Sequence, residues 1–574
     1  MKKNQLPWAF LDEWKGKTFT GQWPTLPEMF RITAERYPDR PCFTDFVPER
    51  VTRTYTEALK NIERLANWLA VSGVTKGSHV AVSGKNSSEW ATVYLATLFA
   101  GGTIIPIDYG LHEPEIENLL NTARPLFFFV DEEKYDHFCK HTCGAQVFSL
   151  SPKYSDTYVY SLETSSRATI TPATELDTAA ILFTSGTTGT PKGVMLSHRN
   201  LVSDCYIAQT NLDLFPTDVF YALLPIHHSY TMQAAFIEPL SVGAEVVFGK
   251  TMAVTRMLKE LKEGKITILL GVPLLFNKLL AGILKGIKDK GPVVNGIMHF
   301  LMGVSYLVKK VFKVNPGKRL FKAVLEKASI STLRIAICGG GPLAASVFKV
   351  YNQLGIDFIQ GYGLTETSPI IALNPVERFK IESVGQFFAP HMEMKILEPD
   401  EDGVGEVAVK GPMVMEGYYK MPDETAAVFT EDGFFKTGDL GRLDNENYLY
   451  LAGRAKNMIV TEGGKNVYPE EIENQFQLVT DIEQITVQGY IMDEATKSEG
   501  IEALIYPSDE LFNRLQLLRG DMESTDLVKE TVDGLVAEVN RRLQPYSRIS
   551  RTTILEEPLE MTTTKKVKRT YSKK

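Results

Sequence analysis

Short apolar runs rich in β-branched and aromatic residues recur along the first 360 residues, with longer stretches of helical periodicity between them. Continuous apolar runs of this length are typical of strands that are buried on both faces. Strands that alternate with helices form sheets covered by helices, so the pattern predicts an α/β fold. The predicted strands span residues 79–83, 103–107, 126–130, 180–184, 245–248, 267–270, 334–338 and 357–360.

The pattern changes after Val384. Short alternating strands punctuated by glycine, such as 405–411 and 448–451, are typical of a smaller antiparallel β-unit. Near Gly453 the chain is expected to enter a separate α+β domain. This divides it into a large multi-lobed N-terminal domain, residues 1–453, and a small C-terminal domain, residues 454–574.

Composition narrows the classes of function. The chain has 574 residues, 44% of them hydrophobic, which is enough for more than two folding units. Its 70 acidic and 62 basic residues give a net charge of −8, whereas a nucleic-acid-binding protein normally carries a basic surplus. We therefore expect no nucleic-acid partner. Five irregularly spaced cysteines and an N-terminal apolar run too short for a signal peptide predict a cytoplasmic location.

An apolar segment at residues 292–308 stands apart. It has barely the minimum length of a bilayer span, and the polar and glycine residues inside it weaken that interpretation further. A helix at a membrane surface with cations among the headgroups fits better, and a core or subunit-interface helix fits about as well. Peripheral contact of residues 292–319 with the inner membrane face and a homodimer both stay open. The cations that follow are Lys309, Lys310, Lys313, Lys318 and Arg319.

The strongest chemical signal is segment 184–193, which directly follows a predicted buried strand. Its glycine and hydroxyl residues allow N–H and O–H donors to turn toward phosphate oxygens, while Lys192 supplies a positive charge. It is not the P-loop of common NTPases, because Pro191 precedes the lysine and Gly193 follows it. We interpret it as a mobile loop that closes over ATP; a plain Thr/Gly-rich connector is the alternative. The segment comprises Thr184, Ser185, Gly186, Thr187, Thr188, Gly189, Thr190, Pro191, Lys192 and Gly193.

Five further segments follow this loop, and the six together span nearly 300 residues. The set resembles the signatures of the acyl-adenylate-forming superfamily of AMP-binding enzymes, most closely the long-chain fatty acid–CoA ligases. The resemblance covers essentially the whole chain and implies that the C-terminal domain is mobile and that the reaction uses ATP, Mg²⁺ and coenzyme A. The five segments are Gly339-Gly-Gly-Pro342, Gly361-Tyr-Gly-Leu-Thr-Glu-Thr367, Thr437-Gly-Asp-Leu440, Gly453-Arg-Ala-Lys456 and Pro469-Glu-Glu-Ile-Glu473.

The resemblance assigns the adenine contacts to two of these segments. Gly339, Gly340 and Gly341 lack side chains, so a purine or an acyl chain is able to approach the backbone closely, although a tight strand-to-helix turn explains them as well. Tyr362, followed by Gly363, offers a flat face against which adenine can pack.

The same resemblance assigns the metal and ribose contacts. Glu366 offers an oxygen ligand to Mg²⁺, and the hydroxyls of Thr184 and Thr365 would contact the metal and the α-phosphate. Asp439 would accept hydrogen bonds from both ribose hydroxyls, with support from Arg454.

Three lysines have roles implied by the resemblance. Residues 562–569 resemble the superfamily's Thr-x-x-Gly-Lys-Ile-x-Arg motif, in which the lysine reaches into the active site. Lys565 stands in place of the glycine, so the alignment selects Lys566 as the catalytic amine, with the choice between the two neighbours left open. Lys566 and Lys192 would offset charge on the phosphate oxygens. Lys456 matches the hinge between the domains.

Histidine pairs raise the question of a metal site. His228 lies where relatives place a residue beside the substrate carboxylate, and we interpret it as a gate. Its neighbour His227 is expected to point away from it, so a metal role is the weaker alternative. A metal site is also the weaker interpretation of a second set, because on a helix over 133–143 its histidines and cysteines occupy different faces. That set is His137, Cys139, His141 and Cys143.

An insertion at residues 281–329 is similar to one in long-chain acyl-CoA synthetases and favours a fatty acid as the substrate. The predicted reaction activates a medium- or long-chain fatty acid to acyl-AMP with release of pyrophosphate, and then forms a thioester with coenzyme A. Loading of an acyl carrier protein is the enzymatic alternative. A catalytically silent lipid-binding relative is the non-enzymatic one.

Overall fold

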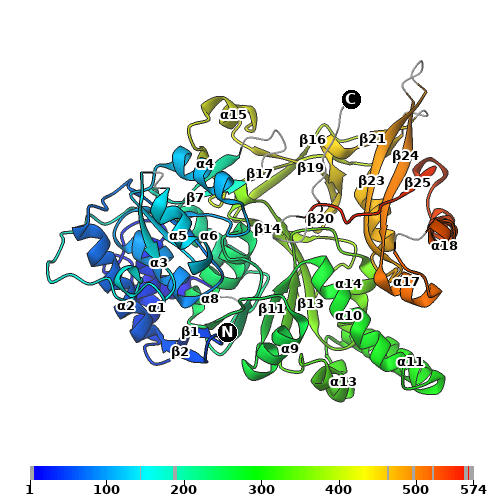
Figure 1. Ribbon diagram of the computed structural model, residues 1–574, viewed down its shortest axis with the longest axis horizontal. Coiled ribbons are helices and arrows are strands. Elements are labelled where there is room, and N and C mark those ends of the chain that lie inside the picture. Colours follow the sequence, from blue (N-terminus) through cyan, green and yellow to red (C-terminus); the bar gives the residue numbers. More distant parts are fainter. Residues whose placement is uncertain are drawn as a thin grey trace.

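The computed structural model describes residues 6–141, 144–184, 191–461, 465–493, 498–519, 522–561 and 567. In Figure 1 the N-terminal helices and strands lie on the left, a long sheet runs through the middle, and the C-terminal strands and helices lie at the upper right. Sheets flanked by helices dominate the molecule, so the predicted α/β fold is confirmed.

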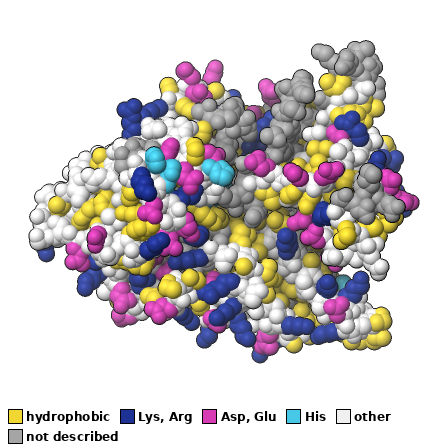
Figure 2. Space-filling model, viewed as in Figure 1, with side chains coloured by type: hydrophobic (Ala, Val, Ile, Leu, Met, Phe, Trp, Pro, Cys, Tyr) yellow, Lys and Arg dark blue, Asp and Glu magenta, His cyan; other side chains and the backbone are white. Residues whose placement is uncertain are grey.

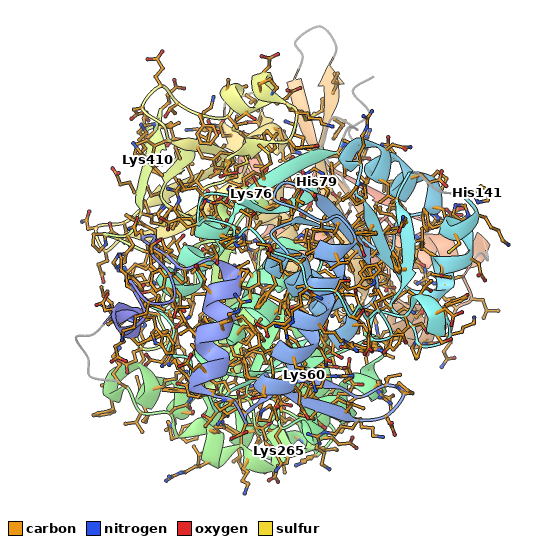
Figure 3. The ribbon with its side chains drawn as sticks, turned by 90° about the vertical axis from the view of Figure 1, so that its left-hand side faces the viewer. Lys60, Lys76, His79, His141, Lys265 and Lys410 are labelled. Atoms are coloured by element: carbon orange, nitrogen blue, oxygen red, sulfur yellow. The ribbon has the colours of Figure 1, made fainter. Side chains whose placement is uncertain are left out.

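A seven-stranded sheet organises the N-terminal lobe, in the order β18-β8-β7-β4-β3-β5-β6. Val80 and Val82 of β3 belong to the core that contains α2 and α3, whereas Ala81 between them belongs to the core that contains α4 and α5. Successive residues of one strand thus enter two cores, as burial on both faces requires. Figure 3 views this side of the molecule, with Lys60 on α2 and His79 at the start of β3.

The bounds of β3, β4, β5 and β7 match the predicted runs closely. The strands are β3 (His79–Ser83), β4 (Thr103–Pro106), β5 (Phe127–Val130), β6 (Gln146–Ser149), β7 (Thr178–Thr184), β8 (Lys192–Ser197) and β18 (Gly417–Tyr418). The helices are α2 (Tyr55–Val71), α3 (Ser88–Phe99), α4 (Glu113–Ala123) and α5 (Glu132–Lys140). Strands β6, β8 and β18 are absent from the predicted set.

A thirteen-stranded sheet crosses the middle of the molecule. Strand β13 pairs in parallel with β12 on one side and antiparallel with β14 on the other, so the sheet changes from parallel to antiparallel pairing at this strand. The antiparallel strands expected after Val384 are present, but they extend this sheet instead of forming a separate one. The order is β16-β17-β19-β20-β15-β14-β13-β12-β11-β9-β10-β1-β2.

The bounds of the thirteen strands are as follows. The first six are β1 (Pro41–Asp45), β2 (Val51–Thr54), β9 (Val219–Ala222), β10 (Glu245–Phe248), β11 (Ile268–Gly271) and β12 (Ile335–Cys338). The others are β13 (Asp357–Gly363), β14 (Ile370–Leu373), β15 (Gly385–Phe387), β16 (Glu393–Leu397), β17 (Gly405–Lys410), β19 (Phe435–Leu443) and β20 (Tyr448–Arg454).

The chain beyond Arg454 builds a further hydrophobic core of its own, which includes Val487, Ile505 and Val532. Gln477 contacts the rest of the molecule: its amide donates to the Pro342 carbonyl at 2.8 Å and accepts from the Ala344 N–H at 2.7 Å. The elements around this core are α16 (Pro469–Glu473), β23 (Ile482–Asp493), β24 (Ser498–Pro507), α17 (Asp509–Leu515), α18 (Met522–Asn540) and β25 (Arg551–Ile554).

A pair of helices, α10 (Pro273–Lys288) and α11 (Pro292–Phe312), projects at the lower right of Figure 1. The apolar segment predicted to be helical is therefore a helix. Among the described residues, no helix is long and apolar enough to cross a membrane.

The expectation that Lys309 lies among headgroup-facing cations is wrong. Its side chain is buried and donates to the Asp357 carboxylate at 2.6 Å and to the Asn352 side-chain oxygen at 2.7 Å. It lies on the inward face of α11, where a buried cation needs such a partner.

Candidate functional site

The segment expected to bind phosphate connects two strands of a hairpin. Strands β7 and β8 pair antiparallel, with Thr184 opposite Lys192, and the Thr184 hydroxyl donates to the Lys192 carbonyl at 3.4 Å. A strand-loop-strand arrangement differs from the strand-loop-helix of a P-loop, in agreement with the sequence argument. The predicted residues Ser185, Gly186, Thr187, Thr188 and Gly189 lie outside the described residues.

Tyr418 brings the predicted cation and the predicted metal ligand together. Its phenol donates to Oε1 of Glu366 at 2.9 Å, and the Lys192 ammonium lies 4.7 Å from the centre of its ring. Strand β18, which carries Tyr418, pairs with β8, so the sheet itself positions this contact. Burial and the nearby Glu366 carboxylate raise the pKa of Tyr418, so the phenol keeps its proton and remains a donor.

Glu366 and Thr365 lie on a 3₁₀ turn, Thr365–Thr367, directly after β13. The Glu366 carbonyl accepts from the Met415 N–H at 2.8 Å, and the Thr365 hydroxyl lies 3.0 Å from that of Ser229. The Glu366 backbone and the Thr365 side chain are thus each held by a segment that is distant in the sequence. One carboxylate with nearby hydroxyls is the kind of ligand set that Mg²⁺ can use, because Mg²⁺ keeps several waters and binds substrate phosphates.

Asp439 joins two other predicted residues into a second cluster. The Tyr362 phenol donates to Oδ2 of Asp439 at 2.5 Å, and Nε of Arg454 lies 2.8 Å from Oδ1. Asp439 and Arg454 are partners in the β19–β20 register, while Tyr362 reaches them from β13. Burial and the Asp439 carboxylate raise the pKa of Tyr362, which keeps it a neutral donor.

Glycines allow the backbone turns that bring the two clusters together. A Cβ at Gly363 would lie 1.7 Å from the Pro369 carbonyl oxygen, so no other residue fits where β13 folds back onto β14. At Gly339 a Cβ would meet the Tyr230 ring at 3.0 Å, and Gly340 has φ of +76°. Gly341 has more room, with Pro273 as the nearest neighbour at 3.6 Å.

The two adjacent histidines point to different partners, as expected. Nε2 of His227 lies 3.4 Å from the Asp108 carboxylate, and Nδ1 of His228 accepts from the Tyr230 N–H at 3.3 Å. Both side chains are therefore engaged with the protein. His228 lies one residue before Ser229, whose hydroxyl contacts Thr365, so the predicted gate adjoins the Glu366 turn.

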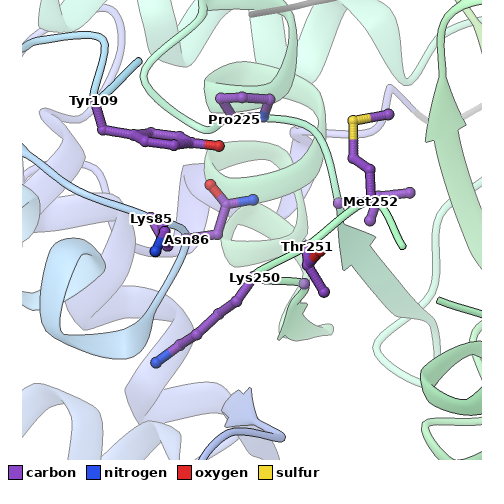
Figure 4. A pocket seen from close by; sticks show the side chains of 9 residues that line it. Lys85, Asn86, Tyr109, Pro225, Lys250, Thr251 and Met252 are labelled. Carbon is purple, nitrogen blue, oxygen red and sulfur yellow. The ribbon is translucent and has the colours of Figure 1, made fainter. Parts of the chain in front are cut away.

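Asn86, which the sequence did not single out, holds the backbone segment that precedes these histidines. It is buried, and its amide nitrogen donates to the carbonyls of Ala222 and Leu224 at 2.7 and 2.9 Å while its oxygen accepts from the Ile226 N–H at 3.0 Å. In Figure 4 Asn86 lies in the middle of a pocket of about 280 Å³, between Tyr109 and Lys250.

Tyr418 and Tyr230 were also missed. The Tyr230 phenol donates to the Ile337 carbonyl at 3.0 Å, and its ring packs against Gly339. The sequence offered one hint of Tyr418, the Gly-Tyr-Tyr run at 417–419, which resembles a short strand. The pairing of that strand with β8, which positions Tyr418, is visible only in the structure. Each of these residues acts through a partner far away in the sequence.

The resemblance assigns roles to a lysine at the predicted hinge and to a lysine near the C-terminus. Lys456 lies in a 3₁₀ turn, Ala455–Asn457, immediately after β20. Lys566 and its neighbour Lys565 lie outside the described residues.

The described members of the second set, His137, Cys139 and His141, do not converge on one point. His137 and His141 stack with ring centres 4.7 Å apart, and His137 pairs with Glu117 at 2.9 Å. Cys139 is exposed, and Cys143 lies outside the described residues. His141 lies at the outer edge of the molecule in Figure 3.

Several known proteins are similar in sequence to this chain. A feruloyl-CoA synthase of Amycolatopsis sp is 28% identical over 484 residues, which cover 79% of this chain and 84% of that protein. A long-chain-fatty-acid–[acyl-carrier-protein] ligase of Arabidopsis thaliana is 27% identical, with 91% of this chain and 80% of that protein covered. A long-chain-fatty-acid–CoA ligase of Mycobacterium bovis is 28% identical, with 90% and 89% covered.

Solved structures share the fold. The ATP-bound crystal structure of MatB from Rhodopseudomonas palustris matches with a TM-score of 0.72 and 26% identity, covering 95% of this chain and 97% of that one. The model of the AMP-binding enzyme family matches residues 30–419, which include Lys192, Glu366 and Tyr418. The chain therefore belongs to the AMP-binding enzyme family.

Proposed function

We propose that this protein uses ATP to activate a medium- or long-chain fatty acid as an acyl-adenylate and then passes the acyl group to the thiol of coenzyme A. The observation that carries the proposal is the pair of clusters at Glu366 and Asp439, which the β13 segment joins within a few residues. A cation with a carboxylate suits a metal-bound polyphosphate, and a second carboxylate held by an arginine suits a ribose. Family membership and the ATP-bound R. palustris neighbour support the same nucleotide.

In the first half-reaction a carboxylate oxygen of the acid attacks the α-phosphorus of ATP, and the bond from that phosphorus to pyrophosphate breaks. Negative charge grows on the phosphate oxygens, where Lys192 and Lys566 would offset it. Tyr418 holds the Glu366 carboxylate in position by its hydrogen bond. Mg²⁺, when bound at Glu366 with help from the Thr184 and Thr365 hydroxyls, supplies further neutralisation of the phosphates.

In the second half-reaction the coenzyme A thiolate attacks the acyl carbonyl carbon, the carbon–oxygen bond to the phosphate breaks, and AMP leaves. We propose that residues 454–574 rotate about Lys456 between the two steps, which would withdraw Lys566. Among the described residues, Gln477 of this region forms hydrogen bonds with Pro342 and Ala344, and Glu510 lies 4.0 Å from Lys285. Polar contacts of this kind can exchange during such a motion.

The acid and the acceptor are the finer parts of the proposal. The insertion at 281–329 and the fatty-acid ligases among the relatives support a fatty acid, whereas the Amycolatopsis relative acts on an aromatic acid by its name. The Arabidopsis relative is named for an acyl carrier protein, which is the second acceptor to test.

The experiment is pyrophosphate release with palmitate, followed by thioester formation with either coenzyme A or a phosphopantetheinylated carrier protein as the acceptor. We expect pyrophosphate release that depends on the acid, and faster transfer to coenzyme A. Faster loading of the carrier protein would show that the carrier protein, and not coenzyme A, is the preferred acceptor. No pyrophosphate with any acid would favour the silent lipid-binding relative.

Asp439→Ala is expected to raise the KM for ATP by roughly tenfold or more with a smaller change in kcat, because ribose contacts are made in the ground and transition states alike. Steady-state kinetics with varied ATP measure this split. Asp444→Ala is the matched control, since Asp444 lies on the same hairpin and pairs with Lys380 away from Asp439. A loss of kcat at unchanged KM for ATP would argue against a ribose contact.

A further inference from the structure

Helix α11 presents a continuous apolar stripe that no described part of the chain covers. The stripe consists of Val293, Ile297, Phe300, Val304, Leu307 and Val311, all exposed, with Val293 and Phe300 more than 70% exposed (74% and 72%). Their spacing alternates between four and three residues, so they follow one face of the helix for about 27 Å.

The opposite face of α11 packs against the protein. Met302 and Ser305 are buried there, Met298 and Leu301 pack beside them, and Lys309 pairs with Asp357. Since this inward face is already covered, the outer stripe is a second, uncovered apolar surface on the same helix. Exposed apolar stripes of this extent mark interaction surfaces, whereas isolated exposed residues do not.

Cations surround the stripe. Residues 278–327 contain eleven lysine and arginine residues against two carboxylates, Asp289 and Glu326, a surplus of nine positive charges in a chain whose net charge is −8. Hydrophobic side chains gather at the lower right of Figure 2, where α11 lies in Figure 1, and Lys and Arg side chains line the adjoining lower edge.

Most of these cations are exposed, and they lie near both ends of the stripe. Lys288 and Lys290 precede α11, and Lys310 lies near its C-terminal end. Lys309 donates to Asp357, Lys313 to the Glu377 carbonyl and Lys318 to the Leu333 carbonyl, so these three are not part of this set.

We propose that the α11 stripe docks on an anionic lipid bilayer surface, with the apolar residues among the upper acyl chains and the flanking lysines at the headgroups. Apolar insertion and cation–headgroup attraction act on the same face, the combination by which interfacial helices bind membranes. A second copy of the chain is the competing occupant. If two copies packed stripe to stripe, the lysines and arginines around each stripe would face those of the other copy, and their repulsion disfavours this arrangement.

The test is co-sedimentation of the full-length protein with extruded vesicles of phosphatidylcholine alone or mixed with phosphatidylglycerol. The wild type is expected to bind the anionic vesicles and to release from them as salt rises. Phe300→Glu with Leu307→Glu should lower the bound fraction at least tenfold. Leu176→Glu, at an exposed leucine outside the surface around α11, is the matched control and should bind as the wild type does.

A second variant tests the charges alone. Lys288→Gln, Lys290→Gln and Lys310→Gln together should weaken binding to anionic vesicles and leave activity on octanoate unchanged, which reports an intact fold. Wild-type protein that fails to bind anionic vesicles, or a stripe variant that binds as well as the wild type, would overturn the proposal. A wild-type dimer that the stripe variant converts to monomer, without vesicle binding by either, would assign the stripe to a second copy and would overturn it as well.

Discussion

Lys566→Ala is expected to slow acyl-adenylate formation by roughly a hundredfold, on the order of 3 kcal/mol, while transfer from chemically made acyl-adenylate to coenzyme A proceeds at nearly the normal rate. In the proposed rotation, the Lys566 ammonium would help only while its domain is docked for the first step, in which negative charge grows on the phosphate oxygens. Rapid-quench measurements of each half-reaction separate the two effects.

Two further variants make this result specific. Lys565→Ala is the matched neighbour and should leave both steps nearly unchanged. Lys456→Pro stiffens the proposed hinge and should do the reverse of Lys566→Ala, with slow thioester formation and normal adenylation. Equal losses in both half-reactions for Lys566→Ala would contradict the rotation, and an adenylation defect in Lys565→Ala alone would move the catalytic amine by one residue.

Glu366→Gln is expected to lower kcat/KM at limiting Mg²⁺ by roughly a hundredfold and to shift the Mg²⁺ concentration for half-maximal activity upward, because it removes a hard anionic oxygen. Titration of magnesium at fixed ATP measures the shift. High Mg²⁺ should restore part of the activity.

Tyr418→Phe provides the graded comparison for this site. It removes one hydrogen bond to Glu366 and keeps the ring beside Lys192, so the loss should be about tenfold or less. Glu382→Gln, at an exposed carboxylate elsewhere, should behave as the wild type. An unchanged magnesium dependence in Glu366→Gln would remove this residue from the metal site.

The sequence predicted the strands of the parallel core well, because their apolar runs are continuous and bounded by glycine or polar residues. Strand β8 was missed since Lys192 and Gly193 open it and its alternation is irregular. The pairing of β8 with β18 depends on residues more than two hundred positions apart, and no local pattern encodes such a contact.

Candidate site residues could be proposed from the sequence where motifs carry them, whereas the residues that contact them could not. Glu366 and Asp439 stand in recognisable segments, but Tyr418 and Asn86 act through partners that only the fold brings near. Lys309 shows the opposite error. Its place after an apolar run suggested a surface cation, yet Asp357 on a distant strand holds it inside.

A single competition experiment measures whether this chain forms acyl-CoA from a fatty acid, as proposed. An equimolar mixture of octanoate, laurate, palmitate and ferulate is incubated with ATP, Mg²⁺, coenzyme A and the protein, and the thioesters are quantified by mass spectrometry. We predict that laurate or palmitate gives the main product, formed at least tenfold faster than feruloyl-CoA, with AMP produced in equal amount. Feruloyl-CoA as the main product, or no thioester at all, would contradict the account.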